Sequence, residues 1–467
     1  MSGETFGSAT GVLPPQQQHH RLKKLALGFH IGQIRPWLIP LLYALAAIVA
    51  GFTIPRYTAI FLPKLVSTMS VGAAIGIYSA IASGMIALTG IVFSLAFVMV
   101  QFSATAYSPR LVLWIARDPV MSHALGVFTA TFLYALTALA WVDRNNSGQV
   151  PLSNLWIVVV LLLASIAMFI SLIHRVGMLQ VNRMLIFTGD QGREIIDSLY
   201  PPIEIPAALS SDQIDTIPCT QTILHHGEPR VVQAVNLPVL VHLATRADSI
   251  IEVVAAVGDS VLDSTPILRV LKGNQSLPAT DLLDAIELGG ERTFEQDPKY
   301  AIRLLVDIAI KALSPAINDP TTAVQALDQI EDLLLRLGNR RLEIGAFRDG
   351  EAKLRVIVAF PRWEDFLCLA FDEIRFYGAN SVQVMRRMQA LLSEMISVLP
   401  EERLSAVRFW QARLQSTIDR SFDDAQDKLD ASTEDRQGLG IARDRLTRGL
   451  PTKEAMPALK KDTFGRY

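Results

Sequence analysis

Cysteine is scarce in this chain of 467 residues: it contains only Cys219 and Cys368, and the two lie far apart. A disulfide framework or a cysteine-based zinc site is therefore excluded. An excess of charge of one sign is also lacking, since 43 Lys and Arg face 45 Asp and Glu and leave a formal net charge of −2. Without a basic field, binding to nucleic acid is not expected.

The common motifs of catalysis and cofactor binding are absent as well. The sequence contains no phosphate-binding loop, dinucleotide fingerprint, zinc-protease helix or nucleophile elbow. His225 and His226 lie near Cys219, but adjacent histidines rarely supply enough convergent ligands for a divalent metal. We therefore expect neither an enzyme nor a protein with a metal or another cofactor.

Hydrophobic residues are abundant, at 50% of the chain, and charges are distributed unevenly. The 139 residues from Pro36 to His174 hold only seven charges, whereas the other 328 residues hold 81, roughly the 25% typical of soluble proteins. The fold class predicted is an α-helical integral membrane domain joined to an α+β cytoplasmic domain.

Four apolar segments approach or reach the roughly 20 residues that a helix needs to cross a bilayer. Tryptophans near segment ends fit the membrane interface. The four predicted transmembrane helices are about Trp37–Ile54, Ala73–Phe102, Ala124–Val142 and Leu155–Ile173. A cleaved signal peptide is the alternative for the first, but its late start and the three spans that follow it favour a membrane helix.

Basic residues beside these segments predict the orientation, because cytoplasmic loops are enriched in Lys and Arg. Eight lie on the side of the chain termini and three on the opposite side. The eight are Arg21, Lys23, Lys24, Arg35, Arg110, Arg117, Arg175 and Arg183; the three are Arg56, Lys64 and Arg144. Both termini should therefore lie in the cytoplasm.

The second segment, about 30 residues long, carries a stripe of small or polar residues at helical spacing, opposite a face of large apolar residues. The stripe consists of Ser79, Ser83, Ala87, Gly90, Ser94 and Gln101. Three interpretations remain open: close packing of membrane helices, which small residues permit, the lining of a water-filled pore, or a lipid-facing helix with no special role.

Residues 221–273 alternate like short strands, at about Arg230–Val235, Ile250–Ala256 and Ile267–Leu271. Between them, Val257-Gly258-Asp259-Ser260-Val261 predicts a tight turn. This stretch resembles the small barrel-sandwich fold of biotinyl and lipoyl carrier domains. It lacks a lysine in the setting of a carrier hairpin, so a covalent cofactor is not implied.

Helices are predicted downstream, first a short one at Asp281–Leu288 and then an apolar one at Pro298–Leu313 that should be buried in a core or an oligomer interface. The rest follow as helix Thr321–Leu337, strand Lys353–Ala359 and helices Trp363–Tyr377 and Val382–Leu399. The organisation expected is a basic, disordered segment (1–35), a transmembrane domain (36–175), a linker (176–220), a β module (221–273), a helical α+β domain (281–400) and a charged, partly disordered tail (401–467).

One polar cluster is a candidate for ligand binding, at the turn between two of these helices. It consists of Asn318, Asp319, Thr321 and Thr322, with Asp307 as a further member. Carboxylate, amide and hydroxyl groups at a helix N-terminus suit a small anion or a cation. Capping explains Asp319 and Pro320 equally well, so a structural role remains open.

Several strings resemble a bacterial family of predicted membrane proteins that is defined only as a domain of unknown function. The most specific string is Ser314-Pro315-Ala316-Ile317-Asn318-Asp319-Pro320-Thr321-Thr322-Ala323, in which Ala316 replaces the glycine common in the family. Supporting strings are Leu305–Ala309, Arg292–Pro298, Trp363–Asp365, Ala370–Asp372, Ile374–Ala379, Gly90–Ser94 and Ser108–Arg110. The resemblance covers about residues 30–400. It implies a protein of the bacterial cytoplasmic membrane and supplies no activity.

Two functional hypotheses follow. The first is a homo-oligomeric channel or channel-like transport protein for a small ion or solute, with the second helix lining the pore and a cytoplasmic regulatory domain. The second is a non-conducting membrane sensor or scaffold whose cytoplasmic part binds a ligand or protein partner. Coupled secondary transport is disfavoured because the four segments contain no Asp, Glu, Lys or Arg in their interiors.

Overall fold

The computed structural model divides the chain into two compact units, which we describe separately: a membrane unit, His30–Phe187, and a C-terminal unit from Thr188 onward. The structure describes residues 38–61, 68–106, 119–140, 142, 149–177, 181–203, 217–273 and 276–440. The expected N-terminal segment 1–35, Pro206 of the expected linker and the last 27 residues of the expected tail lie outside these ranges.

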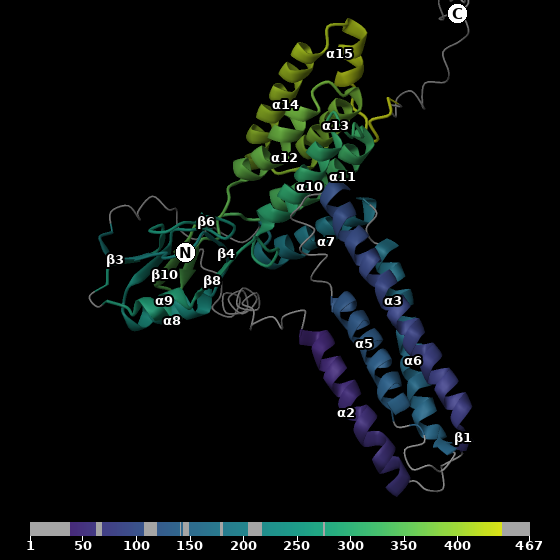
Figure 1. Cartoon of the computed structure of the whole chain (residues 1–467). Helices are drawn as coiled ribbons and strands as arrows, with labels where there is room; N and C mark the ends of the chain where they lie inside the picture. The colour runs from purple at the N-terminus through teal and green to yellow at the C-terminus, as the bar shows by residue number, and fades with distance from the viewer. Residues whose placement is uncertain are drawn as a thin grey trace, which may run out of the picture. The chain divides into compact units, whose positions relative to one another are not determined.

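The membrane unit is built from four apolar helices (Figure 1). They are α2 (Leu38–Phe61), α3 (Val71–Ala106), α5 (Pro119–Ala140) and α6 (Leu152–Gly177). Three contain stretches long and apolar enough to cross a membrane, Val71–Leu95, Val120–Ala140 and Asn154–His174, and α2 contains the shorter apolar stretch Leu38–Ile54. Strands β1 (Thr68–Ser70) and β2 (Gln149–Pro151) pair antiparallel between helices.

Helix α5 packs against α2, α3 and α6. Glycine permits the closest approaches: a Cβ atom on Gly51 would lie 1.9 Å from Thr137 Oγ1, and one on Gly126 would lie 2.6 Å from the ring of Tyr43. Between α5 and α6, Thr131 Oγ1 and Ser165 Oγ lie 2.9 Å apart in a hydrogen bond. Small side chains and buried hydroxyl bonds are the usual means by which helices associate in lipid.

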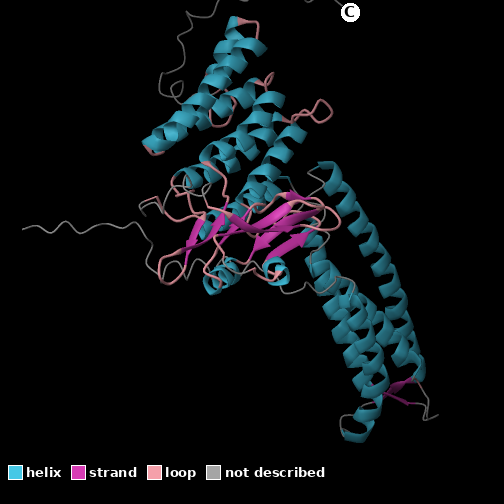
Figure 2. Cartoon of the chain, turned by 90° about the vertical axis from the view of Figure 1, so that its left-hand side faces the viewer, coloured by secondary structure: helices cyan, strands magenta, loops and turns pink. Residues whose placement is uncertain are grey.

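The C-terminal unit contains two open sheets and a group of helices (Figure 2). The five-stranded sheet has the order β3-β7-β5-β10-β9, and the three-stranded sheet has the order β6-β4-β8. The strands are β3 (Cys219–Leu224), β4 (Arg230–Val235), β5 (Ile250–Val253), β6 (Ser260–Val261), β7 (Pro266–Leu271), β8 (Ile286–Gly289), β9 (Ala346–Arg348) and β10 (Leu354–Val358).

The prediction of a barrel-sandwich-like module is wrong. The strands of residues 219–271 are divided between two open sheets, and β5 pairs in parallel with β10, more than a hundred residues further along the chain.

The Gly258 turn has a different role from a carrier hairpin. Gly258 has φ +90°, and a Cβ atom there would lie 2.4 Å from Asp297 Oδ2, so glycine lets the turn approach the Arg292–Asp297 ion pair. Burial raises the pKa of Asp297 above its ordinary value, although Arg292 opposes this effect.

The helices of the C-terminal unit largely follow the predicted segments. They are α8 (Leu237–Arg246), α9 (Ala279–Leu283), α10 (Pro298–Ala312), α11 (Pro320–Gly338), α12 (Trp363–Tyr377), α13 (Val382–Val398), α14 (Glu401–Ser421) and α15 (Ala425–Ser432). The segment 281–288, predicted as one helix, instead contains the end of α9 and then strand β8. Helix α10 is buried on several sides, as its composition predicts.

A buried ion pair joins α11 to α13. Arg387 of α13 is only 1% exposed, and its Nε donates to Asp328 Oδ1 at 2.8 Å while Nη2 contacts Glu331. Asp328 is about half exposed, whereas Glu331 is largely covered. Because the guanidinium is desolvated, removal of one partner would leave an uncompensated buried charge, which costs more than the same loss at the surface.

Candidate functional site

The predicted stripe on α3 faces away from the other helices of its own subunit. Ser79, Ser83, Ala87, Gly90, Ser94 and Gln101 are all exposed. A Cβ atom added to Gly90 would meet no heavy atom within 4 Å. The opposite face is packed, with Met85 at 2% and Val92 at 0% exposure.

The helical repeat explains this division. Successive stripe residues are spaced by three, four or seven positions, which keeps them on one side of a helix with 3.6 residues per turn. The stripe also continues toward the start of α3 through Gly72 and Gly76, which have open space around their Cα atoms. At 36 residues, α3 is about 54 Å long at ~1.5 Å per residue, which exceeds the roughly 30 Å hydrocarbon core.

Large residues also lie on this face: Ile86, three positions after Ser83 and four before Gly90, is 58% exposed. Phe97 lies three positions after Ser94 and four before Gln101, so it occupies the same face, and it is 69% exposed. The sequence analysis did not single it out because it selected small and polar residues. The signal was nevertheless present, since the seven-residue gap between Ser94 and Gln101 omits one position of the helical repeat.

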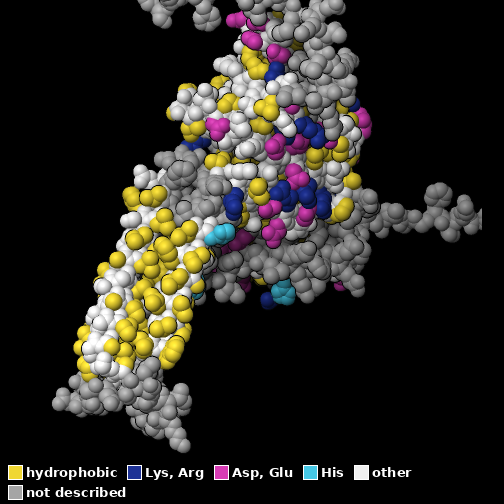
Figure 3. Space-filling model, turned by 90° about the vertical axis from the view of Figure 1, so that its right-hand side faces the viewer, with side chains coloured by type: hydrophobic (Ala, Val, Ile, Leu, Met, Phe, Trp, Pro, Cys, Tyr) yellow, Lys and Arg dark blue, Asp and Glu magenta, His cyan; other side chains and the backbone are white. Residues whose placement is uncertain are grey.

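The outward face of α6 differs from that of α3. Its exposed residues are large and apolar: Trp156, Val160, Leu163, Ile166, Ile170 and Ile173. Hydrophobic side chains also cover the face of the membrane unit seen in Figure 3, whereas charged side chains appear over the C-terminal unit. A continuous apolar face is suited to lipid. The exposed side of α3 also carries large apolar residues, among them Ile86 and Phe93, but small and polar residues lie between them.

The candidate ligand-binding turn follows α10. Asp319 is the N-cap of α11, where its Oδ1 accepts from Thr322 N at 3.1 Å and its Oδ2 from Thr322 Oγ1 at 2.6 Å. Asn318 has φ +49°, a left-handed conformation that asparagine tolerates better than most residues. Thr321 Oγ1 accepts from Gln383 Nε2 at 3.5 Å. These contacts fit the capping role, and ligand binding at this turn stays a prediction.

Asp307 belongs to a different group of contacts. Its Oδ1 accepts from Arg303 Nε at 2.7 Å, and Arg303 Nη1 lies 2.7 Å from Glu373 Oε2 on α12. Partial burial opposes the charge on Arg303, but Asp307 and Glu373 together raise its pKa above the ordinary value. Asp307 thus takes part in an ion-pair network that links α10 with α12.

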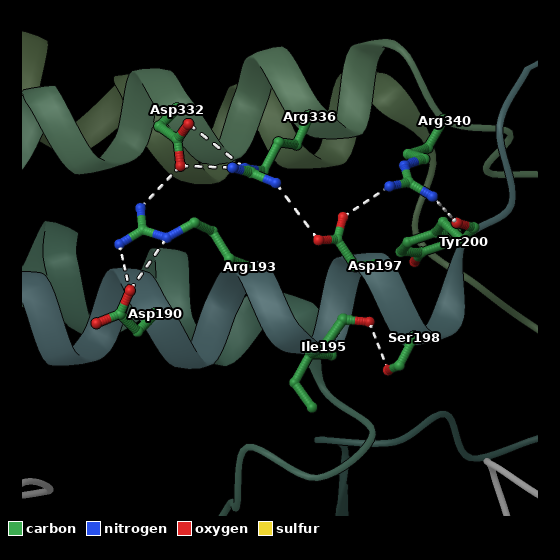
Figure 4. A network of polar contacts seen from close by, with 9 residues as sticks. All are labelled: Asp190, Arg193, Ile195, Asp197, Ser198, Tyr200, Asp332, Arg336 and Arg340. Carbon is green, nitrogen blue, oxygen red and sulfur yellow. Dashed lines mark hydrogen bonds and ion pairs between the residues drawn. The ribbon is translucent and has the colours of Figure 1, made fainter.

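A further helix, α7 (Val181–Leu199), lies where the sequence analysis placed a linker. From Thr188 onward it packs along α11 through alternating charges (Figure 4). Arg193 lies between Asp190 at 2.7 Å and Asp332 at 2.8 Å, and Asp197 bridges two arginines. The arginines that Asp197 bridges are Arg336, at 3.4 Å, and Arg340, at 2.7 Å.

Packing rather than charge should dominate the energy of this contact. The charged groups are partly exposed, and such ion pairs usually contribute about 1 kcal/mol or less. Gly192, by contrast, faces the buried Leu333 and Ala301: a Cβ atom there would lie 2.8 Å from Leu333 Cδ1 and 3.0 Å from Ala301 Cβ.

Substituting Gly192→Val should therefore destabilise the protein by about 2 kcal/mol, since overpacking a tight contact typically costs 1–3 kcal/mol. Thermal unfolding of the purified protein in detergent measures the effect. Arg193→Ala is the matched control, with an expected loss of about 1 kcal/mol or less because it removes only exposed pairs. Equal or reversed losses would show that the ion pairs carry the contact.

The histidines near Cys219 do not form a metal site in the structure. His225 is buried with Nε2 2.7 Å from the carbonyl oxygen of Glu228, and His226 lies 3.6 Å from Asp263. Within the described ranges, no group of three or more His, Cys, Asp or Glu side chains is arranged to hold a metal ion.

Together these features define a helical membrane protein with an attached α+β unit. A family model described as "Predicted membrane protein (DUF2254)" matches residues 34–394, so the chain belongs to that family. It is 27% identical to uncharacterized proteins of Mycobacterium tuberculosis and Mycobacterium bovis, over 427 residues that cover 87% of this chain and 80% of each relative. No solved structure matches the chain.

Proposed function

We propose that the protein is a homo-oligomeric channel for small ions or solutes, with α3 of each copy lining the pore and the C-terminal unit regulating it. The proposal includes no catalytic activity and no cofactor. It places the protein in the bacterial cytoplasmic membrane with both termini in the cytoplasm, because eight basic residues flank the spans on that side and three on the other.

The observation that supports the proposal is the exposed stripe on α3. A Cβ atom added at Gly72, Gly76 or Gly90 would meet no heavy atom of the same subunit within 4 Å. The exposed side of α6 carries large apolar groups such as Leu163 and Ile170, whereas on α3 large apolar groups alternate with the small and polar residues of the stripe. A ring of α3 helices would surround a narrow path with Ser83, Ser94 and Gln101, whose polar groups favour water.

The alternative is a non-conducting sensor or scaffold in which the same stripe packs tightly between copies. The small residues at i, i+4 spacing favour it, since Gly76, Ala80 and Gly84 form the kind of face that lets two membrane helices approach. In that case the turn at Asn318–Thr322, or another surface of the C-terminal unit, binds the partner or ligand.

Electrical recording and sizing of two variants separate these functions. Gly90→Leu and Ser94→Leu should change single-channel conductance severalfold while the oligomer remains intact, because the added side chains narrow the path. The measurements are planar-bilayer currents and the size of the detergent-solubilised complex. Ala167→Leu is the matched control, since Ala167 is exposed on α6 and should affect neither property.

Loss of the oligomer in both stripe variants, with no current from the wild type, would favour the scaffold. Silent bilayers together with a monomeric wild type would contradict both functions.

A further inference from the structure

Three buried polar atoms in the described part of the membrane unit have no hydrogen-bond partner in the protein. They are Tyr78 Oη on α3, Tyr134 Oη on α5 and Asn154 Oδ1 on α6. Their residues are 0%, 1% and 3% exposed. These atoms lie on three different helices, so they do not result from one irregular segment.

The three residues occupy the same region of the helix bundle. Tyr78 and Tyr134 belong to one buried cluster. Val158 of α6 is also a member, and Asn154 lies one helical turn before Val158 on the same face. The other buried members are small or apolar: Ala47, Ala74, Ala130, Ala138 and Val150.

Other polar side chains of this unit have partners. Thr131 bonds to Ser165, Thr137 Oγ1 donates to the carbonyl oxygen of Leu133 at 3.0 Å, and Tyr43 Oη lies 3.3 Å from His123 Nδ1. A polar atom left unpaired in an apolar interior costs several kcal/mol, so native structures nearly always satisfy it. Two such atoms in one cluster, and a third one helical turn from the cluster member Val158, indicate a bound molecule that completes their hydrogen bonds.

The chemistry of the three atoms defines that molecule. Each phenol both donates and accepts, whereas the carboxamide oxygen only accepts. Tyr78, Tyr134 and Asn154 are uncharged, so these three side chains supply no charge that would neutralise an ion. We propose that Tyr78, Tyr134 and Asn154 form an internal binding site for water within each subunit. Buried water of this kind typically makes about three hydrogen bonds to otherwise unsatisfied groups. The inference does not depend on whether the protein conducts.

Removal of single hydroxyl groups from the full-length protein in detergent tests the site. If Tyr78 and Tyr134 bond to water, Tyr78→Phe and Tyr134→Phe should each lower the equilibrium ratio of folded to unfolded protein about threefold to tenfold. Tyr43→Phe, which loses a contact with His123, provides the scale for a more exposed hydroxyl that has a partner in the protein. If the cluster is dry, removing an unpaired hydroxyl stabilises the protein, and a raised unfolding midpoint in both variants would overturn the proposal.

Radiolytic labelling of the wild-type protein in oxygen-18 water is an independent test that requires no variant. Water held in the site should place the label on Tyr78 and Tyr134 despite their burial. Phe128 is the internal control, because it is 0% exposed and lies in a separate, entirely apolar cluster. After correction for the reactivity of each ring, labelling of the two tyrosines no greater than that of Phe128 would contradict the site.

Discussion

Replacing Phe97 by alanine should increase the current through the unstimulated protein by about thirtyfold or more. If α3 lines a pore, the exposed Phe97 side chains of neighbouring copies meet in the stripe and form a hydrophobic constriction, which excludes water and closes the path. Exposure of a phenylalanine side chain to water costs about 2–3 kcal/mol, which corresponds to a factor of about 30–150. Planar-bilayer recording measures the unstimulated current.

Ile91→Ala is the control for this prediction. Ile91 is 56% exposed on the same helix, and the six positions between them turn it about 120° away from Phe97. Its loss should leave the current unchanged. A wild type that conducts and a Phe97→Ala variant with the same current would reject the constriction and retain the pore, whereas no current from either would reject the pore.

Substituting Arg387→Ala should have the largest effect on stability, about 3 kcal/mol. The buried guanidinium pairs with Asp328 and Glu331, and its removal leaves the largely covered Glu331 carboxylate without this partner and a space between α11 and α13. Breaking a buried pair on one side typically costs 3–5 kcal/mol, and the exposure of Asp328 places this case at the lower end. Thermal unfolding in detergent should show a midpoint lower by about 5–10 °C.

The matched control is Arg408→Ala, which removes an arginine 3.6 Å from Glu401 at a site where both side chains are more than half exposed. Its loss should be about 1 kcal/mol or less. A second variant separates charge from packing: Glu331→Gln combined with Arg387→Met should recover part of the stability, because it removes the uncompensated carboxylate while retaining the volume. If Arg387→Ala and Arg408→Ala melt alike, the pair is not a structural contact of this kind.

Hydrophobic periodicity in the sequence predicted those helices and strands whose formation depends on residues a few positions apart. Alternating β-branched residues predicted the strand Arg230–Val235 with the bounds that the structure shows. The bounds predicted for the helix Trp363–Tyr377 also agree with the structure. In the membrane unit, helical periodicity separated the packed face of α3, with Met85 and Val92, from the exposed stripe. These assignments depend on neighbours three or four positions away, which a single sequence contains.

Features that depend on distant partners were not predictable in the same way. Helix α7 is a different case, because its apolar residues recur at helical spacing, among them Leu185, Ile196 and Leu199, and the pattern that could have replaced the predicted linker was present in the sequence. The Gly258–Asp259 turn was predicted correctly as a turn, but the sheets on either side of it depend on strands far along the chain. The segment expected as a charged tail from residue 401 includes α14 and α15, where Leu404, Trp410 and Leu414 supply a sparse buried face. The unpaired hydroxyls of Tyr78 and Tyr134 emerge only when three helices come together.

The parallel pairing of β5 with β10 has a consequence for biosynthesis. Val356 lies opposite Ile251, so the inner strand β5 gains its second neighbour only after the intervening α10 and α11 have been made. Until then β5 is an apolar edge strand with unpaired backbone N–H and C=O groups in the nascent chain, and such edges promote aggregation. A chain that terminates before residue 354 retains this exposed edge permanently, so the N-terminal half of the sheet is a poor candidate for independent expression.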